Sequence, residues 1–466
     1  MPCRDFGIEN IERVHFIGVG GVGMSGIASV AAKQGMKVSG SDLKESKYSK
    51  LLRQDGVEVF VGHDAANVEN TRPDVVVAST AIPQNNPELV AAKAAGIPVW
   101  PRAKMLAYVC RGLKVIAAAG THGKTTTSSM AASALMTLDA DPSFLVGGIL
   151  DGYNGNARYG EGQWCVIEAD ESDGSFVYLD PYIAIITNIE ADHLDHYSGI
   201  DEIREAFASF IAETPEGGCV IACADCEGVP EVARSCGKAK VILYGQSDGA
   251  DVKVSPCGDG SFEVEMPDGQ KATAKLAANP GVHNMLNAAA VLAALVEAGF
   301  GLEESVRAGE KFSGVRRRFD KVGEARGVTV VDDYGHHPTE IAATIAAAAS
   351  MGYKRVHVLF QPHRYSRTQM LANEFGPAFD GADEVTVMDV YSAGETPIPG
   401  VTGKTVADAI LAHDPSKKVS WVQGRSEVVR HLLDNLSAGD LLITMGAGDV
   451  TQIGPRVVEA LENEAE

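Results

Sequence analysis

Short apolar runs that each end at glycine, serine or aspartate recur along the whole chain. Examples are VHFIGVG at residues 14–20, KVIAAAG at residues 114–120 and VTVVDD at residues 328–333, and segments with helical spacing follow them. A short apolar run of this kind is typical of a strand that is buried on both faces of a parallel sheet, with its carboxyl end facing a ligand. The sequence therefore predicts an α/β fold class.

Three such strand-and-helix segments follow one another, and 466 residues are too many for one hydrophobic core. We predict a Rossmann-like domain at residues 1–107, a central P-loop ATPase-type α/β domain at residues 108–315 and a C-terminal Rossmann-like α/β domain at residues 316–466. Residues 246–280 turn polar with short alternating pieces, which predicts a small antiparallel addition to the central domain.

The charge balance limits the partners that the chain can have. Its 40 Lys and Arg residues stand against 62 Asp and Glu residues, a net charge of −22. Such a surface repels nucleic acid and anionic lipid, so an anionic ligand needs a local basic pocket. The sequence has no signal-like start and no apolar run of membrane-spanning length, so we predict a cytoplasmic protein without membrane insertion. We also expect a monomer or a weak homo-oligomer.

Four of the eight cysteines cluster in one region: Cys219, Cys223, Cys226 and Cys236. Cys223 and Cys226 form a C-x-x-C pair, but a structural zinc site usually joins two such pairs. We therefore predict reduced thiols with no zinc, and the role of this cluster stays open at this point.

The first segment carries a G-x-G-x-x-G pattern. Gly18, Gly20 and Gly23 lie between an expected strand and an expected helix, and Asp42 follows at the distance of a ribose-binding acid. The pattern predicts a diphosphate at a helix N-terminus without choosing between NAD and a sugar nucleotide. A glycine-rich packing turn is the alternative.

The stretch GTHGKTTT, residues 120–127, resembles a phosphate-binding loop. Lys124 is placed to reach terminal phosphates, and Thr125 to bind Mg²⁺. Ala118 occupies the position of the first glycine in the common pattern, which is therefore incomplete. Because this loop predicts ATP in the second segment, we assign the diphosphate of the first segment to a substrate.

Carboxylates follow two strands that are expected beside this loop. Residues 164–173 bring Glu168, Asp170 and Glu171 to a strand end, and residues 183–195 bring Asp192 and His193. Acidic side chains beside a phosphate loop predict bound Mg²⁺. His193 is not a ligand type that Mg²⁺ prefers.

Eight motifs in order resemble the Mur ligase family over nearly the whole chain: GVGGVGMSGIA, GTHGKTTT, EADESD, NIEADHLDHY, GVHNMLNA, GVRRRFD, DDYGHHPTE and QPHRYSRT. The family's phosphate loop also lacks the first glycine. The resemblance implies an ATP-dependent carboxylate–amine ligase that joins L-alanine to the lactyl carboxylate of UDP-N-acetylmuramate through an acyl phosphate. ADP and phosphate would be released, and the product would serve peptidoglycan precursor synthesis in the cytoplasm.

The resemblance also implies roles for individual residues. The catalytic group would be Lys124, Glu168, His193, Arg318 and His336. Thr125, Glu168 and His193 would hold two Mg²⁺ ions, for which Mn²⁺ can substitute. ATP would contact Gly120, Thr121, Gly123, Lys124, Thr125, Thr126, Asn284, Asn287, Arg318 and Asp333. The UDP-sugar would contact Gly18, Gly20, Gly21, Gly23, Asp42, Ser79, His122, Asn156 and Arg158. The amino acid and product would contact Tyr334, His336, His363, Arg364 and Arg367.

Two alternatives to this function stay open. The first is the branch of the family that attaches a whole tripeptide to the same nucleotide sugar; it typically has EADEYD where this chain has Ser172. The second is a nucleotide-binding regulatory protein switched by ATP. The carbamylated lysine of several Mur ligases has no counterpart, because no lysine occurs between Lys124 and Lys238, as expected of the alanine-adding branch.

Overall fold

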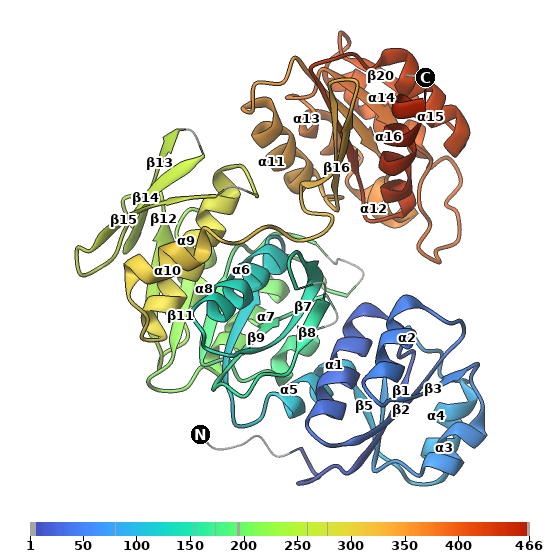
Figure 1. Cartoon of the computed structure of the whole chain (residues 1–466), viewed down its shortest axis with the longest axis vertical. Coiled ribbons are helices and arrows are strands. Elements are labelled where there is room, and N and C mark those ends of the chain that lie inside the picture. The colour runs from blue at the N-terminus through green and yellow to red at the C-terminus, as the bar shows by residue number, and fades with distance from the viewer. Residues whose placement is uncertain are drawn as a thin grey trace. The chain divides into compact units, whose positions relative to one another are not determined.

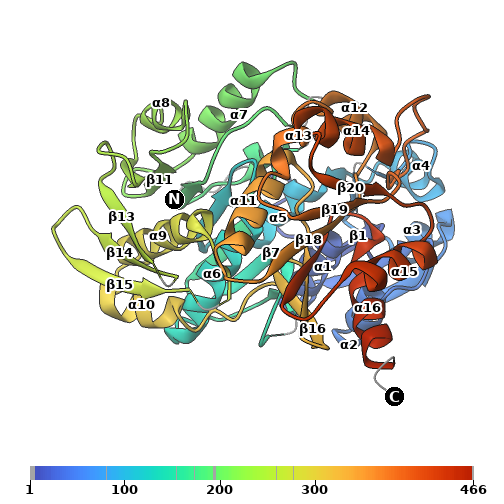
Figure 2. The same cartoon turned by 90° about the horizontal axis from the view of Figure 1, so that it is seen from above.

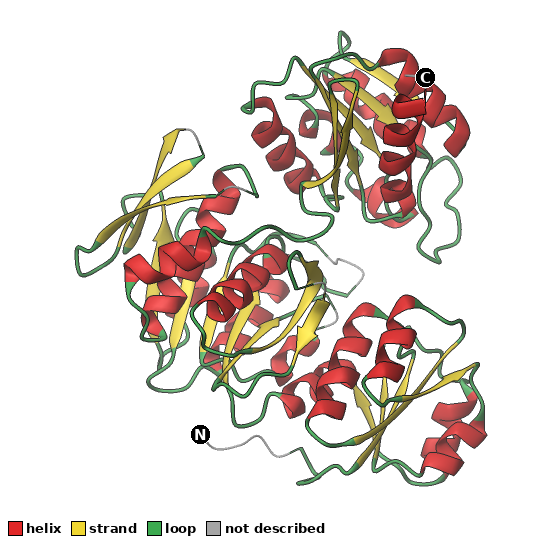
Figure 3. Ribbon diagram, in the orientation of Figure 1, coloured by secondary structure: helices red, strands yellow, loops and turns green. Residues whose placement is uncertain are grey.

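The computed structural model describes residues 6–79, 81–153, 155–172, 174–192, 196–258, 260–276 and 278–463 (Figure 1). It comprises two compact units. The first contains the described residues up to Lys275 together with Leu286–Phe312, and the second contains Leu276–Met285 with the described residues from Ser313 onward. Helices alternate with strands through both units (Figure 3), as the α/β fold class predicts.

The first unit begins with a sheet of five parallel strands, counted among the described residues, in the order β3-β2-β1-β4-β5. Two hydrophobic clusters cover its two faces. Met24 and Leu52, on α1 and α2, belong to one cluster, and Val68 and Leu89, on α3 and α4, belong to the other. The elements are β1 (Arg13–Ile17), α1 (Val22–Lys33), β2 (Lys37–Asp42), α2 (Lys47–Gln54), β3 (Glu58–Val61), α3 (Ala65–Thr71), β4 (Val75–Ala78), α4 (Pro87–Ala94), β5 (Val99–Pro101) and α5 (Arg102–Val109).

A second sheet of the same unit has ten strands within the described part, in the order β15-β14-β13-β12-β11-β10-β6-β9-β7-β8. Its centre is parallel, and β13, β14 and β15 pair antiparallel, which confirms the predicted addition. The strands are β6 (Lys114–Ala119), β7 (Ser143–Leu150), β8 (Gly155–Arg158), β9 (Trp164–Glu168), β10 (Ile183–Ile186), β11 (Cys219–Cys223), β12 (Lys240–Gly245), β13 (Val252–Gly258), β14 (Ser261–Glu265) and β15 (Lys271–Lys275).

Helices cover this sheet on both faces (Figure 2). The helices are α6 (Lys124–Thr137), η1 (Ser175–Tyr178), α7 (Ile200–Ala212), α8 (Val229–Arg234), α9 (Val282–Glu297) and α10 (Leu302–Gly309). One hydrophobic cluster runs from Phe16 of the first sheet through Met105 of α5 to Ile167 of the second sheet and Phe207 of α7. The two sheets of this unit therefore share a continuous core.

The second unit has a sheet of six strands in the region described, in the order β16-β17-β21-β18-β19-β20, with only β16 antiparallel. Ile341 of α11 and Ile410 of α14 pack in one cluster, and Val428 of α15 and Val457 of α16 in another, so helices line both faces. The elements are β16 (Asp320–Ala325), β17 (Val328–Asp333), α11 (Pro338–Ala349), β18 (Arg355–Phe360), α12 (Tyr365–Met370), α13 (Phe375–Ala378), β19 (Glu384–Val387), α14 (Gly403–His413), β20 (Lys418–Trp421), α15 (Arg425–Asn435), β21 (Asp440–Met445), η2 (Asp449–Gln452) and α16 (Ile453–Asn463).

The predicted α/β class with parallel sheets is confirmed, and Pro338 begins α11 as proline at the first helical position predicts. The domain limits after residues 107 and 315 stay a prediction. Among the described residues, no helix has both the length and the apolar character needed to cross a membrane.

Candidate active site

The loop between β6 and α6 has a backbone that requires glycine at two positions. Gly120 has φ 136° and Gly123 has φ 85°, both in the region that favours glycine. A Cβ atom at Gly120 would also lie 2.1 Å from the Thr187 hydroxyl oxygen. The next residue, Asn188, accepts a hydrogen bond from the backbone N–H of His122 at 2.8 Å. The end of β10 therefore holds the loop in shape.

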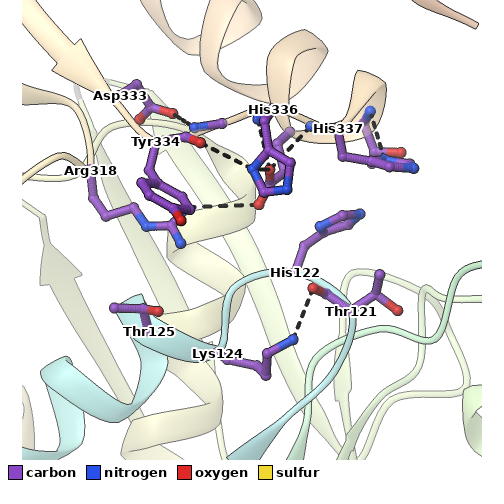
Figure 4. A network of polar contacts seen from close by, with 12 residues as sticks. Thr121, His122, Lys124, Thr125, Arg318, Asp333, Tyr334, His336 and His337 are labelled. Atoms are coloured by element: carbon purple, nitrogen blue, oxygen red, sulfur yellow. Dashed lines mark hydrogen bonds and ion pairs between the residues drawn. The ribbon is translucent and has the colours of Figure 1, made fainter. Parts of the chain in front are cut away.

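Lys124, the first residue of α6, has its ammonium group surrounded by acceptors. It donates to the carbonyl oxygen of Thr121 at 3.1 Å (Figure 4). It also donates to the carbonyl oxygen of Gly120 at 2.6 Å and to Oε1 of Glu171 at 2.8 Å. Burial alone would lower the pKa of Lys124, but attraction to Glu171 and Asp170 outweighs it and raises that pKa. The ammonium is therefore charged at neutral pH, as a phosphate ligand must be.

Thr125 and Glu168 form an oxygen-only pair beside Lys124. The Thr125 hydroxyl lies 3.0 and 3.1 Å from the two carboxylate oxygens of Glu168, and the Gly147 N–H donates to the same carboxylate at 2.7 Å. A hydroxyl and a carboxylate in contact are the donor types that Mg²⁺ prefers. The residues present therefore fit the predicted magnesium ion.

A side chain that sequence reasoning missed links the two sheets of this unit. Arg102, the first residue of α5, lies 3.5 Å from the carboxylate of Asp170 at the end of β9. A Cβ atom added to Gly23 in α1 would lie 3.3 Å from the same guanidinium. Arg102 therefore brings a positive charge between the glycine turn and the acidic strand end. The pairing spans 68 positions in the chain, and no motif marks it.

The glycine turn of the first sheet brings several of the predicted UDP-sugar residues close to one another. Gly18 has φ 81°, and the Gly20 N–H donates to the Asp42 carboxylate at 2.9 Å. A Cβ at Gly20 would lie 2.8 Å from that carboxylate, so a side chain there would displace Asp42. Gly21 is the N-cap of α1, and the Ser79 hydroxyl lies 3.9 Å from the position of a Cβ at Gly18. The structure thus brings the predicted residues of this turn together.

The remaining residues predicted for the UDP-sugar lie in different places. The Asn156 amide on β8 donates to the carbonyl of Val22, the first residue of α1, at 3.2 Å, so it lies beside the glycine turn. His122 lies in the phosphate loop, with Nε2 3.5 Å from Glu190. Arg158 instead forms an ion pair with Asp141 and donates to the Pro142 carbonyl at 2.7 Å. The structure does not bring Arg158 to the glycine turn.

In the second unit, Arg318 lies in a strained segment. Its neighbours Arg317 and Phe319 have φ 64° and 51°, a conformation that side chains other than glycine rarely adopt. The Arg318 guanidinium lies 5.3 Å from the centre of the Tyr334 ring and 3.7 Å from a carboxylate oxygen of Glu340 (Figure 4). Backbone strain of this kind is found mainly at functional sites, so its presence on both sides of Arg318 indicates that the position of this arginine matters for function.

Asp333, at the end of β17, is buried and accepts backbone hydrogen bonds from Gly335 at 2.7 Å and Phe319 at 2.9 Å. Burial raises the pKa of Asp333 from 3.8 to about 6, although Arg318 and these N–H groups oppose the rise. At neutral pH the Asp333 carboxyl is therefore mostly ionised, and a carboxylate can accept the hydrogen bonds that ribose hydroxyls donate.

This pKa gives a pH-dependent prediction for folding. Between pH 3.8 and about 6 the folded chain holds a proton on Asp333 that the unfolded chain has lost. The free energy of unfolding therefore falls as the pH rises through this window, and the loss stays above it. In urea titrations across the window, we expect wild type to lose stability relative to Asp333→Asn. A constant difference between the two proteins would contradict this.

The residues predicted for the amino acid gather at the ends of β17 and β18. Nδ1 of His336 lies 3.5 Å from the Glu340 carboxylate. The ring centres of His336 and His363 are 5.7 Å apart, and the Arg367 guanidinium lies 3.4 Å from Nδ1 of His363. Burial, followed by positive neighbours, lowers the pKa of His363 to about 3. Arg364 has φ 68°, and the ring of Tyr334 lies 5.6 Å from that of His336. A neutral His363 among cations is suited to accept a hydrogen bond.

Four further residues were predicted for ATP or metal, and the structure describes three of them. Asn284 and Asn287 lie one turn apart on α9, and both are buried. Asn284 donates to the Pro280 carbonyl at 3.1 Å, and Asn287 lies against the loop, 3.0 Å from the position of a Cβ at Gly123. Thr126 is buried in the first turn of α6. His193, predicted to bind the second metal ion, lies outside the described residues.

Known proteins resemble this chain along its length. Family models match at residues 13–113 (Mur ligase family, catalytic domain), 118–295 (Mur ligase middle domain) and 317–448 (Mur ligase, glutamate ligase domain). UDP-N-acetylmuramate–L-alanine ligase of Geotalea daltonii is 46% identical over 454 residues, covering 97% of this chain and 98% of that protein. The chain belongs to the Mur ligase family.

Solved structures of Mur ligases agree with this assignment. UDP-N-acetylmuramate-alanine ligase from Thermotoga maritima matches with a TM-score of 0.79 and 29% identity, covering 98% of this chain and 100% of that one. A murein peptide ligase from Psychrobacter arcticus matches with a TM-score of 0.71 over 97% of this chain and 99% of that one. Its identity is 24%, so this second likeness supports the Mur ligase fold alone.

Proposed function

We propose that this Mur ligase joins L-alanine to the lactyl carboxylate of UDP-N-acetylmuramate at the expense of ATP. The observation that carries the choice of substrate is the relative from Geotalea daltonii, named for this reaction and 46% identical over 97% of the chain. The contact of Thr125 with Glu168 beside Lys124 supports ATP as the co-substrate. The product would serve peptidoglycan precursor synthesis, in the cytoplasm.

The chemistry explains why ATP is needed. A carboxylate resists attack by an amine, so the γ-phosphoryl group is first transferred to the lactyl carboxylate. The resulting acyl phosphate has a good leaving group. The amine of L-alanine then attacks its carbonyl carbon, and phosphate leaves. Crowded negative charge is the main barrier to phosphoryl transfer, and the buried ammonium of Lys124 is a preorganised positive charge that opposes it.

Thr125 and Glu168 are the residues that we propose to hold Mg²⁺. When bound there, the ion supplies positive charge to the phosphate oxygens during transfer. The role of the chain is to place a hydroxyl and a carboxylate together at the start of α6, with Glu168 fixed by the N–H of Gly147. A second ion held by His193 stays part of the proposal.

The residues of the second unit are proposed for substrate contacts. Asp333 and Asn284 are proposed for ATP and Arg318 for its γ-phosphate, and Tyr334, His363, Arg364 and Arg367 for the amino acid and product. His336 is proposed to order or deprotonate the incoming ammonium. Its Nδ1 lies 3.2 Å from the Tyr334 carbonyl oxygen and near Glu340, so Nδ1 carries the proton of the neutral ring and Nε2 is its basic nitrogen.

The two alternative functions are less well supported. The tripeptide-attaching branch is represented by the UDP-N-acetylmuramate:L-alanyl-γ-D-glutamyl-meso-diaminopimelate ligase from Neisseria meningitides at 29% identity over 66% of this chain. The alanine ligase from Geotalea daltonii is 46% identical over 97% of this chain. A regulatory switch would need no cluster such as His336, His363 and Arg367 in addition to its nucleotide site. We therefore favour the alanine ligase.

Phosphate release with substrates omitted in turn tests the proposal. We expect phosphate release only when ATP, UDP-N-acetylmuramate and L-alanine are all present. The acyl phosphate forms from the first two, and its phosphate leaves when the amine of L-alanine attacks. A matched reaction with the tripeptide in place of L-alanine separates the two branches of the family. Equal ATP hydrolysis without the sugar nucleotide would contradict a ligase, and faster turnover with the tripeptide would favour the other branch.

A further inference from the structure

The side chain of Arg317 ties the segment before β16 to two neighbouring strands of the second unit. Its Nε donates to the carboxylate of Asp332, on β17, at 3.1 Å. Its Nη2 donates to the carbonyl oxygens of Gly446 at 2.6 Å and Gly448 at 3.3 Å, which follow β21. The Asp332 carboxylate is nearly buried and also accepts from the Thr444 hydroxyl at 2.6 Å. Because β17 and β21 pair directly, these acceptors form one fixed frame.

The backbone of the same segment is held in a conformation that it would otherwise leave. Arg317 and Phe319 have φ 64° and 51°, one on each side of Arg318. The Arg317 carbonyl accepts from the Tyr334 N–H at 2.8 Å, and the Phe319 N–H donates to Asp333 at 2.9 Å. A strained segment keeps its shape only where several contacts fix it at once. These backbone bonds and the Arg317 side chain together keep Arg318 in one place.

We propose that Arg317 is a positioning residue, whose side chain holds the strained segment so that the Arg318 guanidinium is in place before ATP arrives. The inference rests on the proposed function, in which Arg318 contacts the γ-phosphate. Two nitrogens of Arg317 already donate to the chain itself, so it acts through Arg318. A charge that is fixed in advance stabilises a transition state without the cost of reorganisation. Arginine suits this role because its planar fork reaches a carboxylate and carbonyls together.

The same sheet contains a matched ion pair at its opposite end. Arg355 begins β18 and donates to Asp440, the first residue of β21, at 2.6 and 3.1 Å, and to the Asn435 carbonyl at 3.0 Å. Its side chain is 28% exposed and that of Asp440 0%, against 27% for Arg317 and 4% for Asp332. Disrupting either pair is therefore expected to affect stability alike, whereas only the Arg317 pair is expected to affect turnover.

The test compares two double variants in which no carboxylate is left buried without its cation: Arg317→Met with Asp332→Asn, and Arg355→Met with Asp440→Asn. Phosphate release at saturating ATP, UDP-N-acetylmuramate and L-alanine is expected to fall about 10²-fold in the first, the scale of a small misplacement of a reacting group. The KM for ATP is expected to change little, because the contact is made in the transition state. The second variant is expected to keep wild-type turnover, with a similar urea midpoint.

A cycle with Arg318→Met separates positioning from a purely structural role. If Arg317 acts through Arg318, its loss adds nothing once the Arg318 guanidinium is gone. Adding Arg318→Met to the Arg317→Met, Asp332→Asn variant is therefore expected to give the turnover of Arg318→Met alone, whereas independent losses would multiply. Arg317→Lys retains the charge without the fork, so its turnover is expected to lie between that of wild type and that of the Met variant.

A crystal structure of the Arg317→Met, Asp332→Asn variant gives a readout that does not depend on turnover. The Arg318 guanidinium lies 5.3 Å from the centre of the Tyr334 ring in wild type, and we expect it to leave this position in the variant. The inference is overturned if the guanidinium stays, if the Arg317 and Arg355 variants turn over equally, if the losses multiply, or if Arg317→Lys is fully active. Absence of phosphate release by wild type with all three substrates would instead contradict the proposed function.

Discussion

Replacing Glu168 by alanine is expected to lower turnover by roughly 10²–10³-fold, the scale seen when one preorganised group is removed from a transition state. Its carboxylate lies within 3.0 Å of the Thr125 hydroxyl, where we propose that Mg²⁺ binds. Phosphate release at saturating substrates measures the effect. The Mg²⁺ concentration needed for half-maximal turnover is expected to rise as well, because one of the proposed ligands is lost.

The fold is expected to survive this change. Gly147, whose N–H donates to Glu168, is exposed, so water can replace the carboxylate as its partner. Asp201→Asn, at a side chain that is 91% exposed on α7, is the matched control and is expected to leave both turnover and stability unchanged. Glu168→Gln tests the charge alone. Near-normal turnover in Glu168→Gln would assign the carboxylate a hydrogen-bonding role and remove it from the metal site.

Much of this architecture was predictable because its signals are local. An apolar run that ends at glycine and is followed by a helix defines β6, the loop and α6 without reference to the rest of the chain. The same holds for β17, whose last residue, Asp333, lies where the motif indicates. Strand β16 was missed because its alternation is weak and its residues are mostly half-buried or exposed.

Side-chain pairing was harder to predict, because it depends on which strands are neighbours. Residues 164–173 predicted a cluster of carboxylates, but nothing in their order shows that Glu168 contacts Thr125 while Glu171 contacts Lys124. Arg102 reaches Asp170 only because α5 packs between the two sheets. Arg158 was predicted from the resemblance alone, and its nearest partner proved to be Asp141 on a neighbouring turn.

The pair of Lys124 and Glu171 gives the second large effect. Both side chains are nearly buried, at 12% and 3% exposed, and their charged atoms are 2.8 Å apart. Lys124→Met is expected to lower turnover by on the order of 10³-fold, because the charge that faces the phosphates is lost. It is also expected to lower the free energy of unfolding by about 3–5 kcal/mol, because the Glu171 carboxylate stays buried without its cation.

A double substitution separates these two losses. The double variant Lys124→Met with Glu171→Gln carries no buried charge at either position. Replacing a whole buried ion pair by neutral side chains often leaves the stability of a protein unchanged. We therefore expect the urea midpoint to return most of the way to that of wild type, while turnover stays at the level of Lys124→Met. Glu171→Gln alone retains the ammonium and its bonds to the Gly120 and Thr121 carbonyls, so it is expected to keep most activity.

The four proteins form a thermodynamic cycle whose two readouts answer different questions. Stability that recovers in the double variant assigns Glu171 to neutralising Lys124 within the fold. Turnover that stays low assigns Lys124 itself to the phosphates, because a fold restored without the ammonium still lacks the charge that phosphoryl transfer requires. If turnover recovered together with stability, the loss in Lys124→Met would be a folding defect, and the phosphate role of Lys124 would be wrong.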